Sequence, residues 1–505
     1  MMKRLVLLYN GAFAASADVD ETPSMSLMAL SAYLKANGFD CQLLRERSSD
    51  DELRLLLQSC IAAGFSLYTG SGSIRALSVA ARIRRLDPGV ALVFGGVHAT
   101  LEAEQTMRHS LVDYAVRGEG EKTFLELLRM LSGESQTAPD AILGLSHKND
   151  GRIIHNAPRP ASDLEEFPMV DYDLYGPGLT GKPLPYISSR GCPYHCRFCC
   201  SAALNRREGK RFMQLSIKRV AEDLKELVRK HAPSEIRFMD DTFLLNESKI
   251  REFIAAYKQN GFHFPWTALS RCNVFDKLDD STVRSLAEIN MRRLLFGVES
   301  GSQKILDYVS KQIRREQVIG TIEKLARAGL AADFTFMNGF PTETMQDVRE
   351  SLRLGNDIRR ISPRSTVTFF VFTPQPGAEI YDECVSKFGF PRRETLEQWA
   401  DGYEYHTFRP PWLPFSHRNK INVISWASFF DDPEAIRSYA LSSWQRLAFR
   451  LLGADGRIRL RSGWLSFAPE FLLVNWLVVL KTRRFIRNAL RDVPRNSPAG
   501  AVIVG

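Results

Sequence analysis

Two long stretches of the chain alternate between short apolar runs and amphipathic helical segments, and this alternation constrains the fold more than any other feature. Within residues 1–140, apolar runs such as "RLVLLYN", "GFSLYTG" and "ALVFGG" alternate with segments of helical periodicity such as "SIRALSVAARIRRL". Continuous apolar strands between such helices indicate a parallel sheet that is covered on both faces. We therefore predict a doubly wound, Rossmann-like domain of about five strands.

A second series of the same kind begins near residue 184. Its strand candidates are "LPYISS", "EIRFMDD", "FPWTALSR", "RRLLFGVES", "ADFTFMNGF" and "STVTFFVFTP", and helical segments lie between them. These units predict an open, partial TIM-like (β/α)6 barrel over residues 184–394, with its chemistry at the carboxyl ends of the strands. The intervening residues 141–183 are rich in turn formers, so we predict a linker that runs over the surface.

Residues 395–505 follow a third pattern, which begins with an aromatic, Pro-rich segment and continues as a mainly helical region. The apolar run "FLLVNWLVVL" within it has ten residues, about half of what a bilayer-spanning helix needs. It is followed at once by the basic "KTRRFIR". Two interpretations stay open: a helix packed on the barrel, which we favour, and a helix that lies on a membrane surface.

The cysteine distribution and the charge pattern limit the class of protein. Four of the eight cysteines are clustered and four are scattered, which is no disulfide framework and fits a reducing cytoplasm. The N-terminal apolar run is short and is interrupted by Asn10, so we interpret it as the first strand and not as a signal peptide. The net charge of +9 is spread along the chain without the aromatic and basic array that stacks single-stranded bases, so we expect no nucleic-acid partner.

The cysteine cluster has the spacing C-x3-C-x2-C and follows the first strand of the predicted barrel. Cys192, Cys196 and Cys199 could hold three irons of a [4Fe–4S] cluster and leave the fourth iron open. A structural zinc site would use four protein ligands, usually in two pairs, and the chain has no second pair. We therefore favour an iron–sulfur cluster over zinc. Cys200 follows directly, and since adjacent side chains point apart, we expect it to be a small residue of the next turn.

The sequence "CPYHCRFC", with Phe198 before the last cysteine and "ISSRG" before the first, resembles the signature loop of the radical S-adenosylmethionine (radical SAM) superfamily. In that family the open iron binds SAM, and one electron from the cluster cleaves it to a 5′-deoxyadenosyl radical that abstracts hydrogen. The resemblance implies an enzyme with a small-molecule substrate. It also implies an electron donor such as flavodoxin or ferredoxin.

Later strand ends resemble the family's SAM-binding motifs. They are "FMDDTF", "SRCN", "FGVESGSQKIL" and "FMNGFPTET", which come in order along the second series. By this resemblance the residues near SAM are Phe198, Asp240, Asp241, Arg271, Glu299, Ser300 and Gly339. The alternative for the three carboxylates is a helix cap or another structural role.

The first domain resembles the cobalamin-binding domain that accompanies some radical SAM enzymes. The resemblance lies in "YTGSGS", "VFGGVHATLEAEQ" and "VRGEGEKTFLELL", where glycines at strand ends would let the backbone approach a large ring. It implies cobalamin contacts from Thr69, Ser71, Gly95, Gly96, Val97, His98, Gly118, Glu119 and Gly120. The alternatives are a domain that serves only as a scaffold or helps to hold substrate and, for His98, a loop histidine with a structural partner.

One family motif is absent. The pattern Asp-x-His-x-x-Gly, whose histidine binds cobalt from below in several cobalamin proteins, does not occur after the first strand, where the chain reads "NGAFAASADVDETP". We therefore predict that no histidine of the protein is the lower ligand of cobalt.

The resemblance implies a cobalamin-dependent radical SAM enzyme. We expect it to methylate an unactivated carbon of a small molecule, and the aromatic C-terminal segment favours a lipid-like one. An alternative is oxidative cyclisation or ring rearrangement without methyl transfer, as in the anaerobic porphyrin ring cyclase. A third is a non-enzymatic cobalamin or iron–sulfur sensor. We expect a cytoplasmic protein, and the C-terminal region leaves peripheral membrane contact open.

Overall fold

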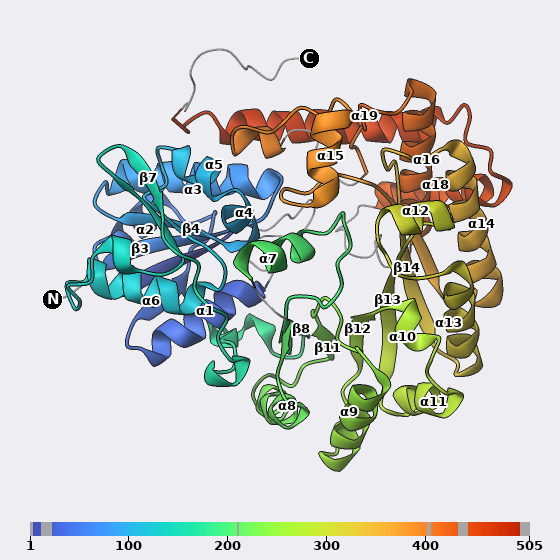
Figure 1. The fold of residues 1–505 in the computed structure, drawn as a ribbon, viewed down its shortest axis with the longest axis horizontal. Coiled ribbons are helices and arrows are strands. Elements are labelled where there is room, and N and C mark those ends of the chain that lie inside the picture. The colour runs from blue at the N-terminus through green and yellow to red at the C-terminus, as the bar shows by residue number, and fades with distance from the viewer. Residues whose placement is uncertain (1–3, 12–22, 210–211, 401–405, 433–442, 495–505) are drawn as a thin grey trace.

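The computed structural model describes residues 4–11, 23–209, 212–400, 406–432 and 443–494. It consists of two α/β units side by side, with C-terminal helices that lie across both (Figure 1). This arrangement confirms the predicted fold class, including the mainly helical C-terminal region.

The first unit is built on a sheet of seven strands in the order β2-β1-β3-β4-β5-β6-β7. Its parallel strands are β1 (Leu5–Gly11), β2 (Asp40–Leu43), β3 (Cys60–Leu67), β4 (Ala91–Gly95) and β5 (Tyr114–Val116). The order 2-1-3-4-5 is that of flavodoxin-like sheets, a doubly wound relative of the Rossmann order. The loops after β3, β4 and β5 therefore meet at one edge of the sheet.

Alternating side chains along β1 explain why helices cover both faces of this sheet. Val6 and Leu8 pack with α1 (Met25–Ala36) and α6 (Gly120–Leu131). Leu7 and Tyr9 pack on the other face with the helices α2 (Asp50–Leu57) and α3 (Ser71–Leu86). Both sides of a strand are buried in this way, which is why "RLVLLYN" is a continuous apolar run.

The predicted linker 141–183 is wrong in part. It contains β6 (Leu145–Asn149) and β7 (Arg152–His155), an antiparallel hairpin that extends the first sheet beyond β5. The hairpin turns at Asp150 and Gly151, whose φ angles of 48° and 75° are those of a type I′ turn. The polar residues of both strands hid the pattern, whereas the "DG" pair was the signal that could have revealed it.

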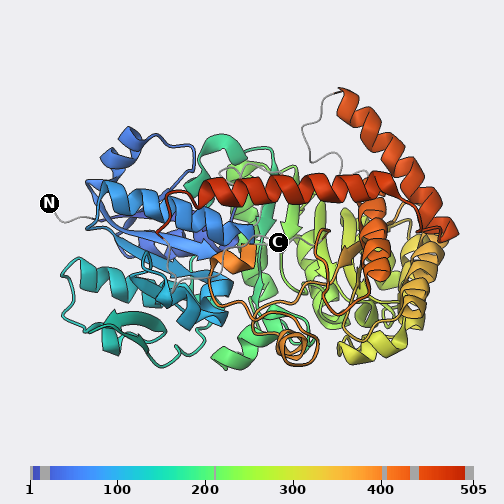
Figure 2. The same cartoon turned by 90° about the horizontal axis from the view of Figure 1, so that it is seen from above.

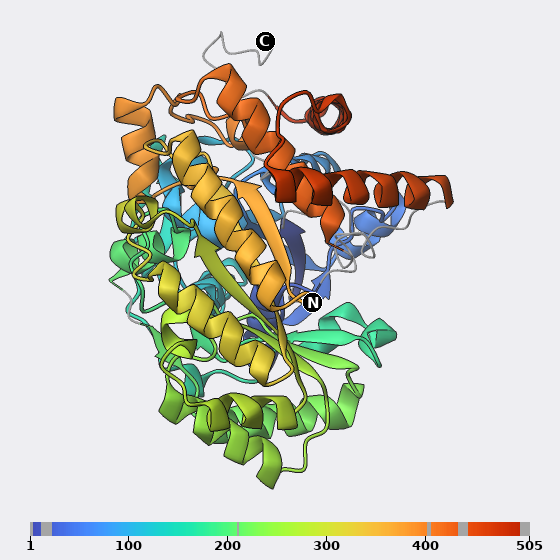
Figure 3. The ribbon, with the colours of Figure 1, turned by 90° about the vertical axis from the view of Figure 1, so that its right-hand side faces the viewer.

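The second unit is an open sheet of six parallel strands in the order β15-β14-β13-β12-β11-β8. The strands are β8 (Pro183–Tyr186), β11 (Glu235–Phe238), β12 (Trp266–Ser270), β13 (Met291–Glu299), β14 (Ala331–Asn338) and β15 (Thr366–Val371). Its helices include α8 (Ile217–His231), α9 (Glu247–Gln259), α11 (Asp280–Glu288), α13 (Arg315–Arg327) and α14 (Met345–Ile361). Figure 3 shows α13 and α14 on the outer face of the sheet. The predicted partial (β/α)6 barrel is confirmed.

The C-terminal region contributes α15 (Glu379–Lys387), α16 (Phe415–Asp431), α18 (Ser443–Ser462) and α19 (Pro469–Ala489). Helix α19, which contains the apolar run, lies along both α/β units (Figure 2). It packs on the first unit through Ile486 against Ile74 and on α16 through Phe471 against Phe430. Within the described parts of the chain, no helix has the length and apolar character to cross a bilayer.

Candidate functional site

The carboxyl edges of the two sheets meet. Helix α4 (Gly96–Leu101), which follows β4, contacts α7 (Cys200–Glu208), which follows the cysteine loop (Figure 1). The guanidinium of Arg207 donates to the carbonyl of Leu101 across this contact. The loops predicted to hold cobalamin and the loop predicted to hold a cluster are therefore neighbours.

The cysteine loop is held in shape by its own helix. The side-chain amide of Asn205 in α7 donates to the carbonyl of Cys192 at 2.8 Å. Gly191 has a φ of +78°, and a Cβ there would lie 2.9 Å from Oδ1 of Asn205. A glycine is therefore required at this position, because an L residue would be strained and would clash.

Arg271 lies against the cysteine loop. Its guanidinium stacks on the ring of Tyr194, 3.7 Å from the ring centre, and Nη1 lies 3.7 Å from Sγ of the buried Cys196. Nη2 donates to the carbonyl of Lys311. The predicted contact of Arg271 with SAM is therefore not supported by this geometry, since the buried guanidinium already binds the loop that carries the thiols.

Cys199 and Cys200 do not point apart as expected. The Cys200 thiol donates to the sulfur of Cys199, which is the N-cap of α7 and also faces the N–H groups of Ser201 and Ala202. These donors hold the pKa of Cys199 below its ordinary value, because they stabilise the thiolate. The pKa of Cys200 is raised, since it supplies the proton of this bond and is buried.

These residues fit a cluster better than a single metal ion. Among the residues that the structure describes, no group of three or more His, Cys, Asp or Glu side chains converges on a point where one ion could bind. Each thiolate of a cubane binds a different iron, so such convergence is not required. The donors at the start of α7 favour the thiolate of Cys199.

The two carboxylates of "FMDDTF" have different surroundings. Oδ1 of the fully buried Asp240 accepts from the backbone and hydroxyl of Ser188 at 3.0 and 2.9 Å and from the hydroxyl of Ser189. Burial raises the pKa of Asp240 to about 6 against these hydrogen bonds. Asp241 pairs with Ser201 of α7. The first carboxylate thus ties the end of β11 to the segment after β8, and its Oδ2 is buried without a hydrogen-bond partner within the described structure, so its predicted contact with SAM stays a prediction. The second carboxylate reaches the helix that follows the cysteine loop.

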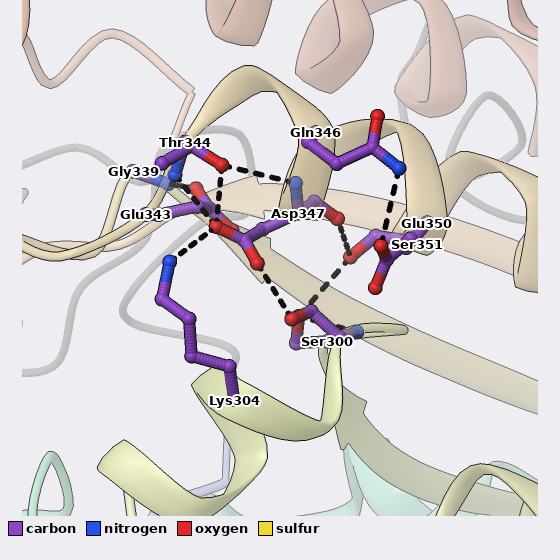
Figure 4. Close-up of polar contacts among 10 residues, drawn as sticks. Ser300, Lys304, Gly339, Glu343, Thr344, Gln346, Asp347, Glu350 and Ser351 are labelled. Atoms are coloured by element: carbon purple, nitrogen blue, oxygen red, sulfur yellow. Dashed lines mark hydrogen bonds and ion pairs between the residues drawn. The ribbon is translucent and has the colours of Figure 1, made fainter.

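The motif at the end of β13 has structural partners. Glu299, with a φ of +69°, forms a buried ion pair with Lys311 at 2.6 Å between Oε1 and Nζ. The hydroxyl of the fully buried Ser300 lies 3.2 Å from that of Ser351 in α14 (Figure 4). The contacts of Glu299 and Ser300 with SAM stay predictions, and both side chains also have partners within the protein.

The end of β14 and the turn after it contain buried polar groups that lack partners in the described structure. The sequence prediction named Gly339 here but missed Asn338 and Glu343. Gly339 has a φ of +103° and its N–H donates to Oε2 of Glu343 (Figure 4). Within the described structure, Oε1 of Glu343 and both side-chain atoms of Asn338 are buried without a hydrogen-bond partner. Such groups are rare unless a ligand satisfies them. Asn338 and Glu343 both lie in "FMNGFPTET", the stretch that resembles a SAM-binding motif.

Phe198 of the cysteine loop reaches toward this strand end. Its ring packs against Phe340 with a centroid separation of 6.2 Å, and Nζ of Lys311 lies 5.8 Å from its centroid. The indole of Trp412, in the aromatic C-terminal segment, donates to the carbonyl of Gly339 at 2.9 Å. That segment therefore packs at the mouth of the barrel, although its residues 401–405 lie outside the described residues.

The predicted cobalamin residues lie after β3, β4 and β5. Gly96 has a φ of +89°, and a Cβ there would lie 2.9 Å from the carbonyl of Leu67. Gly118 also has a positive φ, of 72°. The remaining positions, Thr69, Ser71, Gly95, Val97, Glu119 and Gly120, lie in the same three loops or at the helix starts that follow them. This glycine-lined edge fits the approach of a large cofactor.

His98 is an exception among them. It is fully buried, its Nδ1 lies 3.0 Å from the hydroxyl of Thr69, and its ring packs edge-on against Trp399. Burial lowers its pKa to about 4, so it is neutral near pH 7. The predicted contact with cobalamin is not supported, and the structural alternative fits. The stretch 12–22, where the absent histidine motif would lie, is outside the described residues.

Comparisons with known proteins match both α/β units of the chain. A model of the radical SAM superfamily matches residues 186–355, and a model of the B12 binding domain matches residues 14–128. The chain is 34% identical over 324 residues to an uncharacterised methyltransferase of Pyrococcus horikoshii. The aligned region covers 63% of this chain and 68% of that protein.

Two further proteins show how widely the similarity extends. The chain is 24% identical over 380 residues to an anaerobic magnesium-protoporphyrin IX monomethyl ester cyclase of Rubrivivax gelatinosus, covering 71% of this chain and 65%, just under two thirds, of the cyclase. The fold matches that of TsrM, a radical SAM methyltransferase of Kitasatospora setae, with a TM-score of 0.63 and 18% identity over 87% of this chain and 91% of that one.

Proposed function

Because the chain belongs to the cobalamin-dependent radical SAM enzymes, we propose that it transfers a methyl group to an unactivated carbon of a small-molecule substrate. Its cofactors are a [4Fe–4S] cluster, SAM and cobalamin, and membership in this family excludes the non-enzymatic sensor. When bound, these groups supply the substrate radical and the methyl group. The observation that supports the proposal is the contact between α4 and α7, which follow the carboxyl edges of the two sheets, next to the predicted cobalamin loop and the cysteine loop.

Arg190 makes that contact specific. It lies two residues before Cys192 and binds Glu121, at the start of α6, through both carboxylate oxygens at 3.2 and 2.5 Å. Its Nη1 also lies 3.8 Å from Glu119 in the predicted cobalamin loop. The side chain of Arg190 thus fixes the orientation of the cysteine loop relative to the predicted cobalamin loop.

We assign the cluster to Cys192, Cys196 and Cys199. The chain's own contribution is to hold these thiols in place, through Arg271 at Cys196 and through the start of α7 at Cys199, where the donors also lower the pKa of the thiol. Cys200 is not a ligand in this proposal, because it is the hydrogen-bond donor of the pair.

We assign SAM to the ends of β11 and β14, next to the cysteine loop. Phe198, Asp241 and Gly339 keep their predicted roles, and we add Asn338 and Glu343 because their buried polar atoms lack partners. Cobalamin is assigned to the glycine-lined edge of the first unit, without a histidine lower ligand. By this assignment the cobalamin-binding domain comprises residues 1–140 together with the β6–β7 hairpin, and the radical SAM core comprises residues 184–394.

The test is the product balance. The holoenzyme, reduced and supplied with SAM and candidate substrates, is expected to release both S-adenosylhomocysteine and 5′-deoxyadenosine and to add one CH₂ unit to its product. Formation of 5′-deoxyadenosine without S-adenosylhomocysteine and without a methylated product would refute methyl transfer.

Oxidative cyclisation or ring rearrangement is the second candidate function. The similarity to the anaerobic cyclase over 71% of this chain favours it. Its signature is a product that has lost hydrogens or kept its mass, so the same mass measurement separates the two functions.

The substrate, electron donor and location are further parts of the proposal. Phe340 and Phe372 stack at the barrel mouth with centroids 4.5 Å apart, and Trp412 lies beside Phe372 at 6.2 Å. Phe340 and Phe372 are fully buried, and the partly exposed ring of Trp412 beside them supports an apolar, lipid-like substrate. We propose a cytoplasmic enzyme that takes electrons from a flavodoxin or ferredoxin. Turnover that a chemical reductant supports, and that neither flavodoxin nor ferredoxin supports, would refute this class of electron donor.

A further inference from the structure

Helix α19 carries an unusual row of exposed apolar side chains. Leu473, Trp476, Leu477 and Leu480 are between 43% and 55% exposed. Their spacing of three and four residues places them on one face of the helix. Single exposed apolar residues are ordinary, whereas a contiguous row of large ones marks a surface that another body covers.

The same face continues as a basic row toward the C-terminal end of the helix. Lys481, Arg484 and Arg487 follow Leu480 at helical spacing and are exposed. Between Phe471 and Asn488 the sequence contains no Asp or Glu. From Leu473 onward the exposed face of α19 is thus apolar at first and cationic after Leu480, and the one acidic residue of the helix, Glu470 in its first turn, is paired with Arg459.

The apolar surface continues around the corner that joins α18 to α19. In that corner Trp464 is 55% exposed and Phe467 is 84% exposed. Leu451 and Ile458, which lie two turns apart on α18, are also exposed. Figure 2 shows α18 diverging from the end of α19, so both helices and the corner lie at the periphery of the molecule.

The opposite face of α19 fixes the helix to the rest of the protein. Trp426 of α16 donates to Oδ1 of the buried Asn475 at 3.0 Å. Near the other end, the guanidinium of Arg75 in α3 lies over the ring of Phe485 at 4.8 Å. The exposed row is therefore displayed by a helix anchored to both α/β units.

We propose that this face of α19, with the corner at Trp464 and Phe467, docks the protein onto an anionic lipid surface. Apolar side chains would enter the boundary between headgroups and acyl chains, tryptophan is suited to that boundary, and the cations would meet anionic headgroups. A second copy of the chain is a poorer occupant, because a two-fold contact that pairs the apolar halves leaves the cations at 481, 484 and 487 without acidic partners on this face of the second copy. The proposal goes beyond the methyl-transfer function, which does not require it.

The test is flotation of the full-length, cofactor-loaded protein with vesicles. The probes are vesicles of phosphatidylcholine alone and of phosphatidylcholine with phosphatidylglycerol, at about 0.1 M and about 1 M salt. We expect binding to the anionic vesicles that weakens at high salt. Lys481→Glu with Arg484→Glu is expected to raise the lipid concentration for half-maximal binding at least about tenfold, and Trp476→Asp with Leu477→Asp to do the same.

Two control variants match these changes on other surfaces. Lys218→Glu with Lys225→Glu reverses two exposed cations of α8, far from α19 in Figure 1. Leu55→Asp introduces a charge at a residue of α2 that is 70% exposed. Both controls are expected to bind like the unchanged protein. The proposal is overturned if the unchanged protein stays unbound, if the controls lose binding equally, or if light scattering shows a dimer that Trp476→Asp with Leu477→Asp dissociates.

Discussion

Arg190 and Glu121 form a two-pronged ion pair that joins the cysteine loop to the first helical turn after the predicted cobalamin loop. Glu121 is only 7% exposed in its side chain, so the guanidinium of Arg190 stabilises a carboxylate that is largely shielded from water. The pair links the two cofactor loops directly, and its removal gives the first prediction.

Removal of Arg190 is expected to uncouple the two loops. Arg190→Met removes two hydrogen bonds and the opposite charge from a buried carboxylate, which we expect to lower the free energy of unfolding by about 3 kcal/mol. In turnover the ratio of 5′-deoxyadenosine to methylated product should rise, because the two edges lose their fixed orientation. Denaturant midpoints and product quantification check this. The matched double variant Arg190→Met with Glu121→Gln should recover stability but not coupling, and recovery of neither would contradict the account.

The cysteine assignments predict a sharp contrast between neighbours. Cys196→Ser should abolish the bound iron and sulfide, since one of three ligands is lost. Cys200→Ser should retain both, because a serine hydroxyl can still donate to Cys199. Iron and sulfide analysis after anaerobic purification measures the contrast. Equal loss in both variants would show that Cys200 takes part in binding the cluster.

Arg271 is expected to tune the cluster. A cation 3.7 Å from the sulfur of Cys196 stabilises the more negative, reduced cluster. Arg271→Met should therefore lower the midpoint potential by on the order of tens of millivolts. Arg271→Lys should lower it less, because it keeps the charge without the stacking on Tyr194. A potentiometric titration followed by EPR measures the change, and an unchanged potential in Arg271→Met would refute this role.

Glu343 gives the stability a pH dependence with a defined sign. Burial raises its pKa from 4.5 to about 8, so the folded protein holds a proton between these values that the unfolded chain releases. Stability therefore decreases as pH rises from about 5 to 8, by on the order of a few kcal/mol. Glu343→Gln should flatten this dependence, as followed by unfolding midpoints across that pH range.

Asp347 provides the control for that measurement. Burial alone would raise its pKa, but hydrogen bonds from Lys304, Ser302 and Thr344 lower it to about 2. Its stabilising contribution is present above its ordinary pKa and is lost only as pH falls toward 2. Asp347→Asn should therefore lower stability across pH 5 to 8 and reduce the slope less than Glu343→Gln does, because burial is the main cause of the raised pKa of Glu343 and the charge of Asp347 is a smaller one. A pH slope of stability that changes more in Asp347→Asn than in Glu343→Gln would contradict the raised pKa of Glu343.

The alternation of strands and helices was sufficient to predict both sheets, because burial on one or both faces leaves a direct trace in the sequence. The β6–β7 hairpin escaped because strands such as Arg152–His155 are partly exposed and polar. Contacts between distant residues left no such trace. Lys311 reaches Glu299 and Arg271 reaches Tyr194 only once the chain has folded, so the motif at the end of β13 was predicted as a ligand site although its partner lies within the protein.

The measurement that tests the central claim most directly is turnover with SAM labelled in its methyl group. The holoenzyme, loaded with cluster and cobalamin and supplied with an acceptor substrate, should form S-adenosylhomocysteine and 5′-deoxyadenosine in comparable amounts and place the labelled carbon in the product. Production of 5′-deoxyadenosine with all label retained in methionine, and a product of lower or unchanged mass, would contradict methyl transfer and favour cyclisation or rearrangement.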